Sequence, residues 1–188
     1  MRDPVWLMGS VWREGARDTM REMEDDDNAR HAPESAAVRG DILIEAARPG
    51  DVADIEALVR EAYEPYIARI GRPPGPLGED YAVVVGDGRA TVARRNGRIV
   101  GLLITALHAD HVLIENVAVA TSERGTGLGS ALLAIADDRA RAARVPEVRL
   151  YTQEKMTENL AFYPRRGFVE TGRRTQDGFA RVFFAKRV

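Results

Sequence analysis

The sequence Val117-Ala118-Val119-Ala120-Thr121-Ser122-Glu123-Arg124-Gly125-Thr126-Gly127-Leu128-Gly129-Ser130-Ala131-Leu132-Leu133 reads as an apolar strand, a glycine-rich corner and the start of a helix. Because glycine lacks a Cβ atom, Gly125, Gly127 and Gly129 allow backbone dihedrals closed to other residues and let a ligand approach the amides. The free N–H groups of a helix's first turn would point into this corner, with the positive end of the helix dipole behind them. The corner therefore predicts a binding site for a phosphate or pyrophosphate.

Two common phosphate-binding motifs do not fit the corner. A P-loop needs a lysine directly after its last glycine, and no lysine follows Gly129. A dinucleotide fingerprint needs Gly-x-Gly-x-x-Gly, and Ser130 stands where its third glycine would be. The spacing present is Arg124-x-x-Gly127-x-Gly129, directly after Val-Ala-Val.

This spacing resembles the acetyl-CoA-binding signature of the GCN5-related N-acetyltransferase (GNAT) superfamily, Gln/Arg-x-x-Gly-x-Gly/Ala. The resemblance extends over about residues 42–186 and includes Ala161-Phe162-Tyr163-Pro164-Arg165-Arg166-Gly167-Phe168. The family pattern there is Asn-x-x-Ala-x-x-x-Tyr-x-x-x-Gly-Phe. This chain keeps the tyrosine, glycine and phenylalanine, but has Met156 in the asparagine position and Asn159 in the alanine position. The segment also resembles a bacterial subgroup of the superfamily to which we assign no substrate.

Composition limits the class of protein. The chain has 188 residues, of which 45% are apolar, so one domain with a substantial core is expected. A formal net charge of -2 argues against a nucleic-acid or membrane partner bound by bulk electrostatics. The chain has no cysteine, and its apolar runs are shorter than the roughly 20 residues that span a bilayer. We expect a soluble, cytoplasmic protein, and the oligomeric state stays open, a homodimer included.

Residues 1–40 differ in composition from the rest of the chain. Arginine and acidic residues are mixed along this segment, and no helical or strand period persists. The apolar stretch around Trp6 and Trp12 lacks the basic flank and the length of a signal peptide. We expect residues 1–40 to be a disordered leader, with a docking segment as the alternative, and residues 41–188 to form an N-acetyltransferase domain.

Periodicity predicts a mixed α/β fold after residue 41. Alternating apolar residues and the turn signal Asn96-Gly97 indicate antiparallel strands, and a strand–helix–strand order around the glycine corner indicates a parallel pair. Asp51 is the expected N-cap of the first helix, and Thr157 that of a helix over 158–166, which Pro164 should shorten or bend. Strands are predicted at 42–47, 90–94, 99–107, 111–119, 148–152, 168–172 and 179–184, and further helices at about 51–63 and 128–141.

The family resemblance implies a central, mostly antiparallel sheet with helices on both faces and a parallel strand pair flanking the acyl-CoA site. It implies that the strand over 117–119 binds the pantetheine of acetyl-CoA and that the corner binds the pyrophosphate. The cofactor-binding residues implied are Val117, Ala118, Val119, Arg124, Gly125, Thr126, Gly127, Leu128, Gly129, Ser130 and Asn159.

The segment 63–76 is rich in aromatic, basic, proline and glycine residues, which predicts a shaped loop with at most one short helix. In the superfamily the matching segment forms one wall of the acceptor pocket. The alternative is that the tyrosines only pack on the core and the arginines are solvated. The candidate substrate contacts are Tyr63, Tyr66, Arg69, Arg72, Asp80 and Tyr81.

The candidate catalytic residues are Tyr163, which the resemblance implies, and Glu115, which its position in the strand suggests. Tyr163 matches the family's general acid, which protonates the departing thiolate, and its alternative role is packing over the final hairpin. Glu115 lies in the strand before Val-Ala-Val and would accept the proton of the amine. In the best-known histone acetyltransferases the base lies two residues earlier, at Leu113 here, so Glu115 as a charge in the pocket wall is the alternative.

The predicted function is direct acetyl transfer from acetyl-CoA to a primary amine of a small molecule or protein. A longer acyl-CoA substrate and a non-catalytic acyl-CoA sensor are the alternatives. His108, Asp110 and His111 surround a tight turn without a further ligand pair, so no metal is expected. The expected partners are acetyl-CoA and an amine acceptor.

Overall fold

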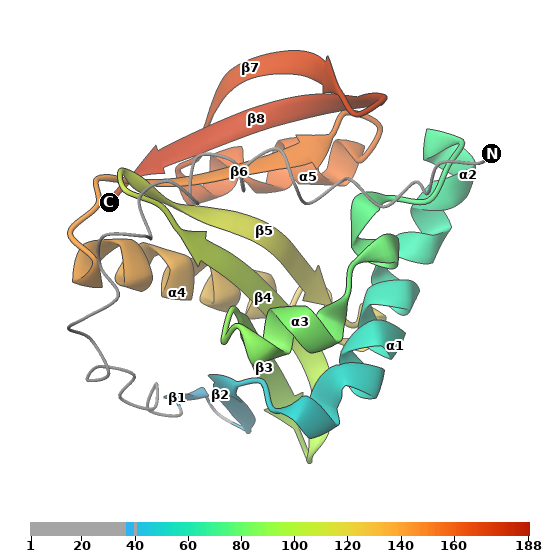
Figure 1. Ribbon diagram of the computed structural model, residues 1–188, viewed down its shortest axis with the longest axis vertical. Helices are drawn as coiled ribbons and strands as arrows, with labels where there is room; N and C mark the ends of the chain where they lie inside the picture. Colours follow the sequence, from blue (N-terminus) through green and yellow to red (C-terminus); the bar gives the residue numbers. More distant parts are fainter. Residues whose placement is uncertain (1–36, 40) are drawn as a thin grey trace. The chain divides into compact units, whose positions relative to one another are not determined.

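The computed structural model describes residues 37–39 and 41–188, which include one mixed eight-stranded sheet (Figure 1). The order of strands across the sheet is β1-β2-β3-β4-β5-β6-β8-β7. Neighbouring strands are antiparallel except for the parallel pair β5 and β6. The strands are β1 (Ala37–Arg39), β2 (Ile42–Ala46), β3 (Ala90–Arg95), β4 (Arg98–Leu107), β5 (His111–Val119), β6 (Glu147–Gln153), β7 (Val169–Gln176) and β8 (Phe179–Arg187).

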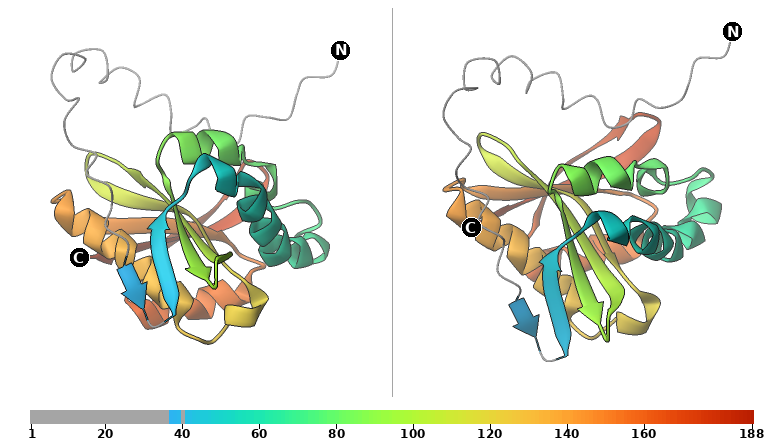
Figure 2. Two further views of the ribbon diagram at one scale, coloured as in Figure 1. Left: turned by 90° about the horizontal axis from the view of Figure 1, so that it is seen from below. Right: turned by 60° about the horizontal axis from the view of Figure 1, so that its bottom comes forward.

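Helices cover the sheet on both faces. On one face lie α1 and α3, and on the other lie α4 and α5 (Figure 2). The sheet and the two helical layers together confirm the predicted mixed α/β class with one parallel strand pair. The helices are α1 (Val52–Tyr63), α2 (Ile67–Ile70), α3 (Tyr81–Gly86), α4 (Leu128–Ala142) and α5 (Thr157–Phe162), with 3-10 turns at Pro49–Asp51, Glu64–Tyr66, Gly75–Gly78, Thr121–Glu123 and Pro164–Arg166.

The core lies on both faces of the central strands. Leu102 and Leu103 are neighbours on β4 and point to opposite faces, yet both are fully buried. On the α4 side, a Cβ atom at Gly101 would lie 3.1 Å from Leu132 Cδ1. The absence of a side chain at Gly101 therefore lets α4 pack close to the sheet, which fixes the position of the glycine corner at its start.

The parallel pair β5 and β6 separates partway along its length. Their register runs from His111↔Glu147 to Ile114↔Leu150 and then stops, although β5 continues to Val119 and β6 to Gln153. On its other side, β5 stays paired with β4 up to Val119, with one register shift that leaves Glu115 unpaired as a bulge. The second half of β5 therefore has an edge that no β6 residue covers.

Some elements differ from the sequence-based expectation. The strand β1 pairs with β2 through residues 37–39, inside the segment expected to be a leader, and the rest of that segment lies outside the described residues. Helix α3 was not predicted either, and the Asp80 carboxylate caps its first turn by accepting from the N–H groups of Ala82 and Val83. Both elements are too short to show a periodic pattern in the sequence, because β1 has three residues and α3 has six.

The predicted caps are only partly right. Asp51 occupies the N-cap position of α1, but its carboxylate accepts a hydrogen bond from the Arg48 N–H instead of from the helix. The N-cap of α5 is Met156, not Thr157 as expected, and it makes no side-chain cap hydrogen bond. As predicted, Pro164 shortens this helix, because α5 ends at Phe162 and a 3-10 turn follows.

Candidate functional site

The glycine corner presents unpaired backbone amides. Gly125 and Gly127 have φ angles of 81° and 92°, which favour glycine, and Gly127 is the N-cap of α4. Among the described residues, no backbone carbonyl accepts from the N–H groups of Gly125, Gly127, Gly129 or Ser130. A Cβ atom at Gly127 would have no atom within 4 Å, so the space beside this residue is open. The corner can thus receive an anion, as its sequence predicts.

Two arginines add positive charge to the corner. Arg124 is exposed, and its side chain makes neither a hydrogen bond nor an ion pair within the described ranges. Arg166 stacks 3.4 Å from the centre of the Phe162 ring, and its Nε donates to Ser130 Oγ at 2.8 Å. The Ser130 hydroxyl is therefore engaged, and only its N–H faces the corner.

The remaining corner residues hold it in shape. Thr126 Oγ1 donates to the Glu123 carbonyl at 2.8 Å, and Leu128 is buried in the core. A Cβ atom at Gly129 would lie 3.1 Å from Phe162 Cζ, so this glycine lets α5 pack against α4. The side chains of Thr126 and Leu128, and the absence of one at Gly129, therefore shape the corner, and the backbone N–H of Gly129 stays open to an anion.

The uncovered edge of β5 lies directly before the corner. Ala118 is buried, and Val117 and Val119 are partly buried. Because these residues have no β6 partner, an extended amide-containing chain could add to this edge as another strand would. The Asn159 side chain on α5 donates from Nδ2 to Thr152 Oγ1 on β6 at 2.9 Å, and its Oδ1 accepts no hydrogen bond among the described residues.

Two of the predicted substrate contacts, Tyr63 and Tyr81, meet at Asn116 of β5. The Tyr63 hydroxyl donates to Asn116 Oδ1 at 2.7 Å, and Asn116 Nδ2 donates to the Tyr81 hydroxyl at 3.2 Å. Tyr81 donates in turn to the Pro76 carbonyl at 2.8 Å. Burial raises the pKa of both phenols, which therefore remain protonated donors at neutral pH. This chain of hydrogen bonds joins α1, α3 and β5 beside the point where β5 leaves β6.

Tyr163 is a buried phenol within an aromatic cluster. Its ring contacts those of Phe162, Phe168 and Phe184 at centroid distances of 5.4, 5.8 and 5.6 Å. Its hydroxyl makes no hydrogen bond to the described residues, and burial raises the pKa of Tyr163. A phenol in this state keeps its proton at neutral pH.

Glu115 is the bulged residue of β5, at the point where the two parallel strands part. Its carboxylate pairs with Arg89, which follows α3 and also contacts Asp87 at 3.4 Å. The Glu115 side chain is 34% exposed, so the pair is open to solvent. Because Glu115 has no partner on β4, it stands outside the regular ladder.

The other predicted substrate contacts form a segment that reaches across the sheet. Arg69 makes two hydrogen bonds to Glu158 of α5, at 2.9 and 2.8 Å, which lower the pKa of Glu158 to about 2. Arg69 also lies 5.2 Å from the Tyr66 ring centre, and Arg72 lies 3.9 Å from the Phe179 ring centre on β8. The segment 63–72 therefore connects α1 to both α5 and β8. Asp80 is engaged in the cap of α3, which gives it a structural role.

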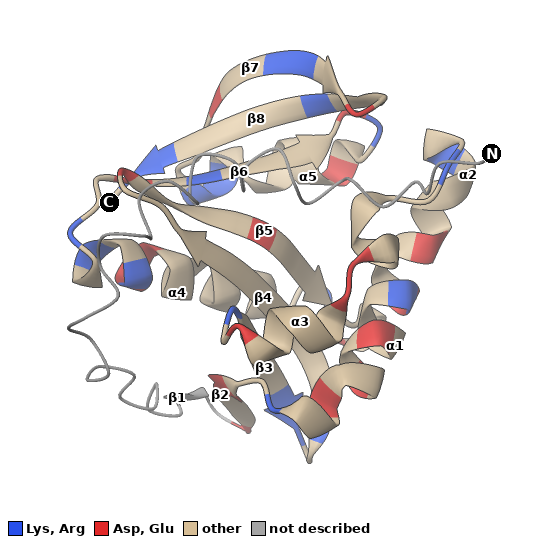
Figure 3. Cartoon of the chain, in the orientation of Figure 1, with Lys and Arg blue, Asp and Glu red and all other residues tan. Residues whose placement is uncertain are grey.

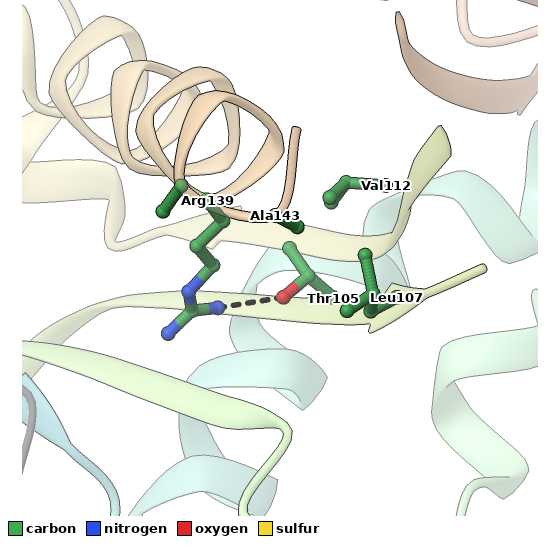
Figure 4. A pocket seen from close by; sticks show the side chains of 6 residues that line it. Thr105, Leu107, Val112, Arg139 and Ala143 are labelled. Atoms are coloured by element: carbon green, nitrogen blue, oxygen red, sulfur yellow. Dashed lines mark hydrogen bonds between the residues drawn. The ribbon is translucent and has the colours of Figure 1, made fainter. Parts of the chain in front are cut away.

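A pocket at the far end of α4 is separate from this site (Figure 4). It is lined by the end of α4 and by β4 and β5, and Arg139 donates to Thr105 within it at 2.6 Å. A 15-residue helix is about 20 Å long, so the pocket lies well away from the glycine corner. Over the described ranges there is no group of three or more His, Cys, Asp or Glu side chains that could hold a metal ion, and no helix long and apolar enough to cross a membrane.

Several residues near the site were not singled out from the sequence. These are Arg89, which pairs with Glu115, the side chain of Asn116, and Tyr151 and Arg181 on the same face of the sheet. Only Arg181 carried a signal in the sequence, because it interrupts the apolar run Phe179-Ala180-Arg181-Val182-Phe183-Phe184. Arg89, Asn116 and Tyr151 have partners that lie 26 to 53 residues away along the chain, which no local pattern encodes.

Comparisons with known proteins agree with this geometry. The crystal structure of the ribosomal-protein-S18-alanine N-acetyltransferase from Escherichia coli has a TM-score of 0.62 at 22% identity, and the match covers 78% of this chain and 94% of that one. The PaiA N-acetyltransferase from Thermoplasma acidophilum, solved in complex with coenzyme A, has a TM-score of 0.66 at 16% identity and 78% and 99% coverage. A GNAT-family acetyltransferase from Listeria monocytogenes has a TM-score of 0.63 at 17% identity and 81% and 99% coverage.

At these identities the structural matches show the fold alone. No curated protein sequence matches the chain significantly. The sequence profile of the acetyltransferase (GNAT) family, however, matches residues 55–168, which is more than half of the chain. Its match includes the glycine corner, both parallel strands and the Tyr163 segment. The chain therefore belongs to the acetyltransferase (GNAT) family, whose general chemistry is acetyl transfer from acetyl-CoA.

Proposed function

We propose that this protein transfers an acetyl group from acetyl-CoA directly to a primary amine of a small molecule or of a protein. The observation that carries the proposal is the separation of β5 from β6 after Ile114 and Leu150, directly before a corner of open amides. The separated edge suits the amides of pantetheine, and the corner suits the pyrophosphate. Together they would place the thioester near the point where the strands part.

The reaction requires stabilisation of an oxyanion. The amine nitrogen attacks the thioester carbonyl, a C–N bond forms, and the carbonyl oxygen becomes negatively charged in the tetrahedral intermediate. A backbone N–H between Asn116 and Val119 on the uncovered edge would donate to this oxygen. When the intermediate collapses, the C–S bond breaks and the thiolate of coenzyme A leaves.

Two protons then have to be moved. Tyr163 would give its proton to the departing thiolate, since its buried phenol stays protonated. Glu115 would accept the proton lost by the amine, directly or through water, on the face that also carries Tyr63 and Tyr81. Its pairing with Arg89 fixes the position of the carboxylate.

The proposed function is tested by measuring release of free thiol from acetyl-CoA with a panel of small amines and lysine-containing peptides. We expect acetyl-CoA to raise the melting temperature and at least one amine to be acetylated. Stabilisation by acetyl-CoA without thiol release from any amine would instead favour the sensor. Faster release of thiol from a longer acyl-CoA would mean that the transferred group is a longer acyl group and not acetyl.

The role of Glu115 is tested by Glu115→Gln. If the carboxylate is the base, kcat/KM at neutral pH should fall, and part of the loss should return as the pH rises, because the amine then deprotonates unaided. The measurement is the pH dependence of kcat/KM for an accepted amine. Asp87→Asn is the matched control, since Asp87 is the other carboxylate beside Arg89. If kcat/KM of Glu115→Gln is lowered by the same factor at every pH, Glu115 is not the base and only contributes a charge to the wall of the pocket.

A further inference from the structure

Arg181 is a buried cation that the proposed reaction does not use. It lies on β8 with 8% exposure, and its guanidinium carries five N–H donors. Its contacts with described residues are an ion pair to Asp177 Oδ2 at 3.3 Å and a stacking contact 4.3 Å from the Tyr151 ring centre. Most of its donors are therefore unused, although leaving donors unpaired near the interior is costly.

The unused nitrogens of Arg181 are open to a ligand. Among the described residues, no nitrogen of Arg181 is both fully buried and without a hydrogen-bond partner. Nitrogens without a partner therefore reach accessible space beside Tyr151. A guanidinium held flat against an aromatic ring presents its donor edge to a planar acceptor such as a carboxylate.

Arg181 lies on the acceptor side of the sheet. In the register of β6 and β8, Tyr151 faces Phe183 and Gln153 faces Arg181, so these side chains share one face. Tyr151 is the first β6 residue beyond the last pair with β5, where the reacting groups would meet. Burial raises the pKa of the Tyr151 phenol, the charge of Arg181 lowers it, and that of Glu115 raises it, so Tyr151 lies close to both charges.

Arginines and carboxylates both surround this position, since the charges of Glu115, Asp177 and Glu79 act on Tyr151 together with that of Arg181. Arg72 stacks 3.9 Å from the Phe179 ring centre and Arg174 stacks 3.8 Å from the Phe183 ring centre, on the same face as Arg181. Figure 3 shows basic residues along β7 and β8. Asp177 is the acidic group paired with Arg181, and Glu115 is paired with Arg89. An acceptor that enters here meets an arginine on one side and the proposed base on the other.

We propose that the acceptor is a small amine that also carries a carboxylate, and that the Arg181 guanidinium binds this carboxylate while the amine lies toward Glu115. This inference rests on the proposed function and names the substrate class of the same site. Asp177 already balances part of the positive charge of Arg181, so the site would bind a ligand group with a single negative charge. A carboxylate fits this arrangement better than a doubly charged phosphate.

The test compares amino acids with their own carboxamides, which share the amine and the side chain but lack the negative charge. With coenzyme A present, calorimetric titration should show that the amino acids bind about tenfold or more tightly than the amides. In the transfer assay the preference should appear mainly in KM. Arg181→Gln should reduce both preferences to about one and leave the stabilisation by acetyl-CoA unchanged.

Two further variants separate binding from packing. Arg174→Gln removes a neighbouring exposed arginine from the same face and should keep the preference. Asp177→Asn leaves the Arg181 guanidinium without its competitor and should tighten binding of the carboxylate. A purely structural Arg181 would give lower melting temperatures in Arg181→Gln and Asp177→Asn with no change in the ratio of amino acid to amide.

The outcomes distinguish this inference from the proposed function. Equal binding and equal transfer for acids and amides would overturn the inference and leave the acetyltransferase intact. Selective binding of the acids without any thiol release would support the inference and overturn the proposed function. If Arg181→Gln does not fold, the response of Asp177→Asn decides, because looser or unchanged binding of the carboxylate in that variant contradicts the inference.

Discussion

The variant Tyr163→Phe is expected to bind acetyl-CoA as the original protein does, with turnover lowered about 100-fold or more. The ring of Tyr163 packs among Phe162, Phe168 and Phe184, and phenylalanine keeps these contacts. The hydroxyl makes no hydrogen bond to the described residues, so its removal leaves no protein donor or acceptor unpaired. What the variant loses is the proton for the departing thiolate.

The measurement is kcat with an accepted amine, together with the rise in melting temperature caused by acetyl-CoA. Tyr66→Phe is the matched control, because Tyr66 is a partly buried phenol on the acceptor wall with no proposed role in proton transfer. Its kcat should change little. Unimpaired turnover in Tyr163→Phe would remove the phenol from the mechanism, and loss of acetyl-CoA binding would mean that Tyr163 acts through packing.

The parts of this fold that the sequence predicts are those encoded by short patterns. The hairpin between β3 and β4 turns at Asn96 and Gly97 with φ angles of 50° and 80°, as the dipeptide predicts. The terminal hairpin likewise turns at Asp177 and Gly178, with φ angles of 54° and 74°. The glycine corner was predictable for the same reason, since both its backbone conformation and its open amides follow from local residue types.

The parts that the sequence did not predict depend on partners far apart in the chain. Glu115 reads as an ordinary strand residue, and only its pairing with β4 shows that it is a bulge. The side chain of Asn116 likewise gains its role from Tyr63 and Tyr81, which lie 53 and 35 residues away. Periodicity assigns such residues to a strand, but the contacts that give them a role arise only from tertiary packing.

The residues encoded by local patterns and those that depend on distant partners belong to different parts of the candidate site. The corner, which would bind the part of acetyl-CoA common to all its reactions, is defined locally by Arg124, Gly125 and Gly127. The proposed acceptor side is assembled from α1, α2, β6 and β8, whose arginines and tyrosines have ordinary spacing in the sequence. The proposed cofactor site therefore follows from a motif, whereas the proposed class of acceptor rests on the position of Arg181.

The variant Gly127→Val is expected to abolish the stabilisation of the protein by acetyl-CoA. Gly127 has a φ angle of 92° at the N-cap of α4, and a Cβ atom there would extend into open space at the glycine corner. A valine side chain would occupy the volume that the pyrophosphate needs. The measurement is the melting temperature with and without acetyl-CoA, and the ligand-induced rise should disappear.

The control must account for backbone strain, because a β-branched residue at this φ angle is unfavourable and costs on the order of 1–3 kcal/mol of stability. Gly97→Val provides it, since Gly97 has a φ angle of 80° and also has no atom within 4 Å of its Cβ position. Both variants should melt at lower temperatures without ligand, but only Gly97→Val should still be stabilised by acetyl-CoA. Gly127→Asn, whose side chain tolerates a positive φ angle, should retain more stability than Gly127→Val and still bind acetyl-CoA poorly. A normal ligand-induced rise in both Gly127 variants would place the pyrophosphate site away from this corner.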